Sequence, residues 1–96
     1  MICSEARIRT SHAANYLATL CERLGAAAPG EGARSLAEIG MAGGSCRLQA
    51  DAERLVIACS AQDEAEVAAM QRQVESHFPP PAEGDRFEFR WHTVTL

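Results

Sequence analysis

The chain has 96 residues, which allows one domain, and we expect residues 1–96 to fold as a single unit. Its 13 acidic residues outnumber its nine basic ones, which are all arginines interleaved with the acids. It therefore lacks the stripe of positive charge that nucleic acids or anionic membrane surfaces require. No apolar run reaches the length of a membrane span, and Met1–Arg7 contains no apolar segment typical of a signal peptide. We expect a cytoplasmic protein with reduced cysteines and with neither a nucleic-acid nor a membrane partner.

The first quarter of the chain predicts a strand followed by a helix. Residues 5–10 alternate apolar side chains with arginines, the pattern of a strand with one exposed face. Thr10 or Ser11 is expected to cap a helix over 11–24, and Gly25 to end it. One side of this helix is apolar, with residues at helical spacing: Ala13, Tyr16, Leu17, Leu20, Cys21 and Leu24.

The middle of the chain predicts three strands. Residues 25–35 are small and rich in glycine, so we expect a surface loop there, followed by an edge strand over 37–41. Two further strands are predicted over 46–50 and 55–59. The second of these is apolar on both faces, so we expect it at the centre of the sheet.

The register between the strands over 46–50 and 55–59 follows from the alternation of their apolar residues. Both apolar rows must face one core, so the numbers of paired residues must sum to an odd value. A turn centred on Ala52 and Glu53 satisfies this condition. The predicted pairs are Ala50 with Leu55, Leu48 with Ile57, and Cys46 with Cys59.

A second helix is predicted over 62–78, because apolar residues recur there at spacings of three and four. Ser60 and Asp63 suit its start as a capping-box-like pair. Pro79–Pro81 must end it, since proline cannot continue a helix.

A last strand is predicted over 86–94, where Phe87, Phe89 and Trp91 alternate with polar residues. We expect these three aromatic side chains to be part of the core. The complete order is β-α-β-β-β-α-β. It predicts an α+β two-layer sandwich with a mainly antiparallel sheet and both helices on one face, ferredoxin-like or related.

Several segments of the chain resemble a bacterial family known as domain of unknown function 2218. The resemblance covers nearly the whole chain and extends to His77 and to the aromatic segment ending at Trp91. It implies a small α+β protein, sometimes found near iron or siderophore uptake functions, and implies no activity. The segments that carry it are Tyr16-Leu17-x-x-Leu20-Cys21, Gly44-Ser45-Cys46-Arg47-Leu48-Gln49-Ala50 and Asp51-Ala52-x-x-Leu55-x-Ile57.

The chain departs from this family's pattern in two places. Members often continue the cysteine of the first helix into a C-x-H-x-x-H stretch, whereas residues 21–26 here read Cys-Glu-Arg-Leu-Gly-Ala. Any binding by those histidines is therefore lost in this chain. Pro79–Pro81 and Gly84 also interrupt a segment that is usually continuous.

Three of the four cysteines, Cys21, Cys46 and Cys59, fall on predicted core faces. A free cysteine in such a place packs as a small hydrophobic residue, and this is the interpretation we favour. One alternative is a Cys46–Cys59 disulfide; another is a zinc or iron site made by these cysteines and His77. No CxxC spacing supports a metal site, so we predict neither a metal nor another cofactor.

Paired carboxylates, nucleophile–base sets and cofactor motifs are missing from the sequence, so we expect a binding or accessory domain rather than an enzyme. Its ligand would enter between the sheet and the helices, lined by Tyr16, Cys21, Cys46 and Trp91, or would be a protein docked on a strand edge. One alternative is a metal- or redox-responsive protein that uses Cys46 and Cys59. Another is a homodimer whose edge strand 37–41 pairs across a twofold axis.

Overall fold

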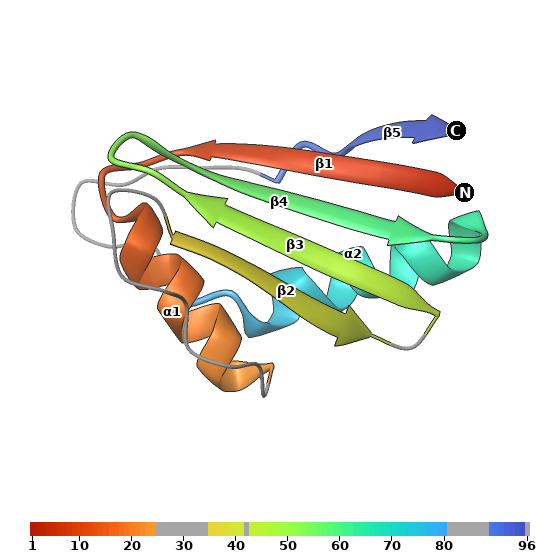
Figure 1. The fold of residues 1–96 in the computed structure, drawn as a ribbon, viewed down its shortest axis with the longest axis horizontal. Helices are drawn as coiled ribbons and strands as arrows, with labels where there is room; N and C mark the ends of the chain where they lie inside the picture. Colours follow the sequence, from red (N-terminus) through yellow and green to blue (C-terminus); the bar gives the residue numbers. More distant parts are fainter. Residues whose placement is uncertain (25–34, 42, 81–88, 96) are drawn as a thin grey trace.

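The chain folds as a two-layer α+β sandwich (Figure 1). The structure, a computed structural model, describes residues 1–24, 35–41, 43–80 and 89–95. The element order and the fold class are those predicted from the sequence. In chain order the elements are β1 (Ile2–Arg9), α1 (Ala13–Arg23), β2 (Ser35–Met41), β3 (Gly44–Ala50), β4 (Arg54–Ala61), α2 (Glu64–His77) and β5 (His92–Thr95).

The five strands form one antiparallel sheet in the order β2-β3-β4-β1-β5. Strands β2, β3 and β4 form a meander, with β2 at the edge and β4 at the centre, as predicted. Strand β1 lies between β4 and β5 and is antiparallel to both. Strands β4 and β5 are therefore parallel to each other, joined through α2, in a split β-α-β arrangement.

The register predicted for β3 and β4 is confirmed at every pair. Ala50 lies opposite Leu55, Leu48 opposite Ile57, and Cys46 opposite Cys59. The turn between the strands is held by Asp51, whose backbone N–H donates to the carbonyl of Arg54 at 3.0 Å.

The core lies between the sheet and the two helices, which both cover the same face of the sheet (Figure 1). Alternate residues of each central strand are buried on this face, because side chains of a strand point to opposite sides in turn. The apolar sides of α1 and α2 complete the core, as their spacing predicts. The largest fully buried apolar side chains are Ile8, Leu17, Leu20, Leu48, Leu55, Ile57, Met70 and Val74.

The starts of both helices differ from the sequence-based predictions. The N-cap of α1 is His12, which makes no side-chain capping bond; the Thr10 hydroxyl instead accepts from the His12 backbone N–H at 2.9 Å. The N-cap of α2 is Asp63, whose carboxylate accepts from the Glu66 backbone N–H at 2.8 Å. Ser60 is part of β4, because β4 continues to pair with β1 beyond it. No helix in the described ranges is long and apolar enough to cross a membrane.

The last strand is shorter and later than predicted. It comprises only His92–Thr95, which pair with the first half of β1. Phe89 and Trp91 precede it and pack against the core, so their alternation reflects aromatic packing rather than strand pairing. Phe87 and Gly25, together with most of the predicted loop 25–35, lie outside the described residues.

A polar link joins three elements on the helix-covered side of the sheet. Ser4 of β1 is fully buried, and its hydroxyl accepts from Gln71 Nε2 of α2 at 2.6 Å. The same oxygen lies 3.2 Å from the hydroxyl of Thr93 in β5. The link satisfies a buried hydroxyl that would otherwise be costly.

Candidate functional site

The face of the sheet turned away from the helices, which we call the open face, is polar and accessible. Three hollows lined by described residues lie on it or at its rim. The open face is therefore where a ligand or partner could reach the sheet. It is made of Cys3, Glu5, Arg7 and Arg9 of β1, Leu36 and Glu38 of β2, Ser45, Arg47 and Gln49 of β3, and Arg54, Val56, Ala58 and Ser60 of β4.

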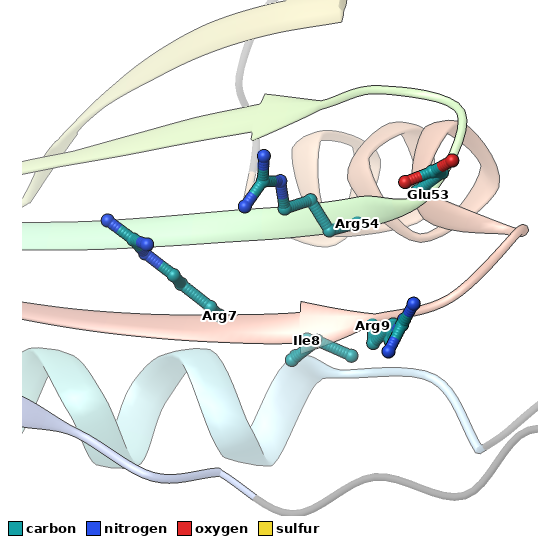
Figure 2. A pocket seen from close by; sticks show the side chains of 5 residues that line it. All are labelled: Arg7, Ile8, Arg9, Glu53 and Arg54. Carbon is teal, nitrogen blue, oxygen red and sulfur yellow. The ribbon is translucent and has the colours of Figure 1, made fainter.

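Three arginines gather at the end of the open face beside the β3–β4 turn, and we call Arg7, Arg9 and Arg54 the arginine end. Arg9 of β1 is the register partner of Arg54 of β4, and Arg7 lies on the same face two residues earlier. Together with Ile8 and Glu53 they line a hollow of about 320 Å³ (Figure 2). The lining residues thus carry three positive charges and one negative charge, in a chain whose net charge is -4.

The arginine end keeps unused hydrogen-bond donors. Arg7 donates through Nε to Glu5 Oε1 at 2.6 Å, and Arg54 Nε lies 3.6 Å from Asp51 Oδ2. Both contacts run through Nε, so the terminal Nη groups remain as further donors. Among the residues that the structure describes, the Arg9 guanidinium has no hydrogen-bond or ion-pair partner.

Asp51 fixes the position at which β4 begins. Its Oδ1 accepts from the backbone N–H of Glu53 at 2.8 Å and of Arg54 at 2.9 Å. The bond from Glu53 is the main cause of a lowered pKa at Asp51; desolvation opposes it, and the backbone N–H and charge of Arg54 add to it. Asp51 is therefore ionised at neutral pH. It holds the turn through Oδ1 and touches Arg54 only loosely through Oδ2.

A second hollow, at the opposite end of the open face, has a different chemistry. Its volume is about 220 Å³, and Cys3 Sγ within it lies 3.1 Å from Ser60 Oγ. The charged residues among the described ones that line it are Arg47 and Glu38, which pair with each other at 3.7 Å. This hollow is charge-balanced, so the arginine end is the stronger candidate. Its lining residues are Cys3, Glu38, Ser45, Arg47, Ala58 and Ser60.

The two aromatic residues of the predicted ligand pocket, Tyr16 and Trp91, are connected by a row of ring contacts. Tyr16 packs on Phe78 with ring centroids 5.2 Å apart, and Phe78 packs on Phe89 at 5.0 Å. Phe89 in turn stacks on Trp91 at 6.0 Å. The Trp91 indole donates to Glu75 Oε1 at 3.3 Å. The rings thus contact one another, with Tyr16 inside the core and the other three partly buried against it.

The other two residues of that predicted pocket, Cys21 and Cys46, are buried together with Cys59. All three are free thiols in the structure, and the Sγ atoms of Cys46 and Cys59 are 3.7 Å apart. The hydrogen bond with Cys59 raises the pKa of Cys46; burial and the nearby thiols Cys59 and Cys21 raise it further. The same hydrogen bond lowers the pKa of Cys59 against the opposing effect of burial. Burial alone raises the pKa of Cys21.

The structure does not bring His77 to Cys46 and Cys59. Cys59 lies near the end of β4, next to the start of α2, whereas His77 is the last residue of that helix. A helix of 14 residues is about 20 Å long, far more than a metal-ligand set can span. His77 Nδ1 instead bonds the carbonyl of Gln73 at 2.9 Å. The described ranges contain no group of three or more His, Cys, Asp or Glu residues placed to hold a metal ion.

Sequence reasoning missed the arginine end, although part of the signal was present. The alternation of residues 5–10 already puts Arg7 and Arg9 on an exposed face. Arg54, however, directly follows the turn predicted at Ala52 and Glu53, and no local pattern relates it to Arg7 and Arg9. Only the pairing of β1 with β4 brings it opposite Arg9, and the sequence did not reveal which strands are neighbours.

Comparisons with known proteins identify the family of the chain. The chain is similar to the protein in the NMR structure of PA4090 from Pseudomonas aeruginosa, with a TM-score of 0.65 and 26% identity over 96% of each chain. No curated protein matches it. A family model described as an uncharacterized protein conserved in bacteria (DUF2218) matches residues 5–92. The chain therefore belongs to the bacterial family DUF2218.

Proposed function

We propose that this protein is a small binding domain that takes an anionic ligand at the arginine end of its open face. The observation that carries the proposal is the direct pairing of Arg9 with Arg54 on neighbouring strands. Like charges opposite each other in a sheet are destabilising unless a counter-charge lies between them. The pairing therefore costs stability in the free protein and is offset when an anion binds.

The chemistry of the three side chains suits an oxyanion. A guanidinium offers parallel N–H donors at the spacing of the oxygens in a carboxylate or phosphate group. Arg9 has its whole guanidinium to offer, and Arg7 and Arg54 have their terminal nitrogens. The 3.6 Å contact of Arg54 Nε with Asp51 is a weak ion pair at an exposed position, and it leaves these terminal nitrogens available.

The space available fits a small molecule rather than a polymer. The hollow of about 320 Å³ adjoins a second one of about 330 Å³, and Arg7 and Arg54 line both. Volumes of this size are at the lower end of those of small-ligand sites. Glu5, Asp51 and Glu53 line the same hollows and would repel a long polyanion, so a compact ligand with one or two anionic groups fits best.

The other hypotheses are less well supported by the geometry. Full antiparallel pairing of β2 with a second copy of itself would put Glu38 opposite another Glu38, and like charges in that position oppose a twofold dimer. The link to iron or siderophore utilisation is no part of the proposal, because the arginine end recognises negative charge rather than a metal. Cytoplasmic localisation remains an expectation from the sequence.

The test is a titration of the ¹⁵N-labelled protein with inorganic pyrophosphate and, separately, citrate, at constant ionic strength. We expect saturable shifts of the Arg7, Arg9 and Arg54 signals with at least one of the two anions. Arg9→Gln should weaken binding about tenfold, as expected when a charged hydrogen bond is lost. The matched control is Arg72→Gln, which removes the same charge from the exposed side of α2 and should leave the affinity within about twofold.

Comparing the affinities for pyrophosphate and citrate distinguishes a phosphate-like ligand from a carboxylate-like one. Binding that weakens equally in Arg9→Gln and Arg72→Gln would mean that only net charge matters, and the proposal would be wrong. Shifts of the same size in sodium chloride alone would also overturn it.

A further inference from the structure

We propose that Cys46 and Cys59 are a disulfide-forming pair that a small peroxide oxidises reversibly inside the folded protein. The two residues are register partners on β3 and β4, and their Sγ atoms are 3.7 Å apart. Both side chains are fully buried, and at this distance the two sulfurs are in direct contact. This inference is independent of the anion site.

The backbone at this pair suits a cross-strand bond. The Asp51 N–H bonds the Arg54 carbonyl, which assigns that pair to the hydrogen-bonded set of the β3–β4 ladder. Hydrogen-bonded and non-hydrogen-bonded pairs alternate in an antiparallel ladder, so Cys46 and Cys59, five steps further on, form a non-hydrogen-bonded pair. The Cα atoms of such pairs are about 4.5 Å apart, within the range that a disulfide spans.

The hydrogen bond between the thiols determines which sulfur reacts first. The contact between the two thiols lowers the pKa of Cys59 and raises that of Cys46. Cys59 is therefore the thiol of the pair that ionises more readily, and the thiolate is the nucleophile in cysteine oxidation. Cys46 is the resolving residue.

The chemistry balances with hydrogen peroxide as the oxidant. The Cys59 thiolate attacks one peroxide oxygen, the O–O bond breaks, and the departing hydroxide takes up the proton that Cys59 released. This yields water and a Cys59 sulfenic acid. The Cys46 sulfur then attacks the Cys59 sulfur, the S–S bond forms, and the hydroxyl leaves as a second water with the Cys46 proton. Two thiols are oxidised, and one peroxide is reduced to two waters.

Burial makes this a slow and selective reaction. The thiols of Cys46 and Cys59 have no exposed surface, so peroxide reaches them only when the sheet or a helix opens locally. The other two cysteines differ from this pair in exposure or in position. Cys3 is partly exposed on the open face, and Cys21 is a buried neighbour that could compete for Cys46.

The experiment maps disulfides in the wild-type protein, so it does not depend on a variant that folds. Native protein is exposed to hydrogen peroxide, denatured in N-ethylmaleimide, digested with trypsin and analysed by mass spectrometry. Cleavage after Arg47 and Arg54 separates the two cysteines. Their peptides are Ser35–Arg47 and Leu55–Arg72.

The expected result is a linked pair of these two peptides, two hydrogens lighter than their sum and separated by dithiothreitol. Cys21→Ala should leave the linkage unchanged, because Cys21 is a bystander. Linkage of Cys46 to the Cys21 peptide would overturn the proposal. So would alkylation of both Cys46 and Cys59 under conditions that oxidise Cys3.

Discussion

Replacing Ser4 by alanine tests the polar link that ties β1, α2 and β5 together. Ser4 is 0% exposed, and its hydroxyl accepts from Gln71 Nε2 at 2.6 Å. Since that oxygen already accepts from Gln71, its own proton is available for the Thr93 hydroxyl at 3.2 Å. One small side chain thus makes two hydrogen bonds between elements that are far apart in the sequence.

The expected cost of Ser4→Ala follows from these two bonds. Each contributes about 1 kcal/mol net to the free energy of unfolding. Thr93 is exposed and can bond water after the substitution, whereas Gln71 is partly buried and is less easily satisfied. We therefore expect a loss of about 2 kcal/mol, which for a domain of this size lowers the melting temperature by about 8–16 °C.

The assay is urea unfolding, monitored by far-ultraviolet circular dichroism. The slope of the unfolding free energy against urea concentration should be the same in the variant and the wild type. A double-mutant cycle with Gln71→Ala should give a coupling energy of about 1 kcal/mol, because the two side chains share one bond. The matched control is Ser45→Ala on the open face, which removes the same hydroxyl and should change stability by less than about 0.5 kcal/mol. A loss below about 0.5 kcal/mol for Ser4→Ala, or strict additivity with Gln71→Ala, would refute this reasoning.

Two further predictions concern the carboxylates that hold local structure. Asp63→Ala removes the oxygen that accepts from the Glu66 N–H at 2.8 Å and should cost about 1 kcal/mol in urea unfolding; an unchanged midpoint would mean that the cap contributes nothing. The pKa of Asp51 is lower in the folded state than in the unfolded state, mainly through the Glu53 N–H. Its contribution to stability is therefore present above its unfolded pKa of about 4 and is lost as the pH falls from there through the folded pKa. Melting temperatures measured from about pH 6 to about pH 2.5 should fall more steeply for the wild type than for Asp51→Asn, and identical slopes would contradict the prediction.

Local patterns in the sequence were enough for most of the fold. The two-residue alternation of β3 and β4 predicted their register to the residue, because a shift of one position would turn every apolar side chain away from the core. The apolar spacing of α1 and α2 likewise predicted which sides of the helices are buried. The last strand was misplaced because Phe89 and Trp91 alternate with polar residues as a strand does, yet pack on other aromatic rings.

The candidate site required information that no local pattern carries. Arg7 and Arg9 were visibly on an exposed face, but Arg54 joins them only because β1 lies beside β4, with 44 residues between Arg9 and Arg54. The same limit applied to the link of Ser4 with Gln71 and Thr93, three polar residues that the sequence does not connect.

The sequence by itself determined the element order, the α+β class, the β3–β4 register and the meeting of Cys46 with Cys59. Each of these follows from periodicity and from a short turn, which act over a few neighbouring residues. Only the tertiary structure decided the strand order β2-β3-β4-β1-β5, and with it the arginine end and the separation of His77 from Cys46 and Cys59. Strand order depends on the path that the long connections take across the sheet. It also depends on which faces of the sheet and the helices can be buried together. That is a property of the whole packed core rather than of any segment.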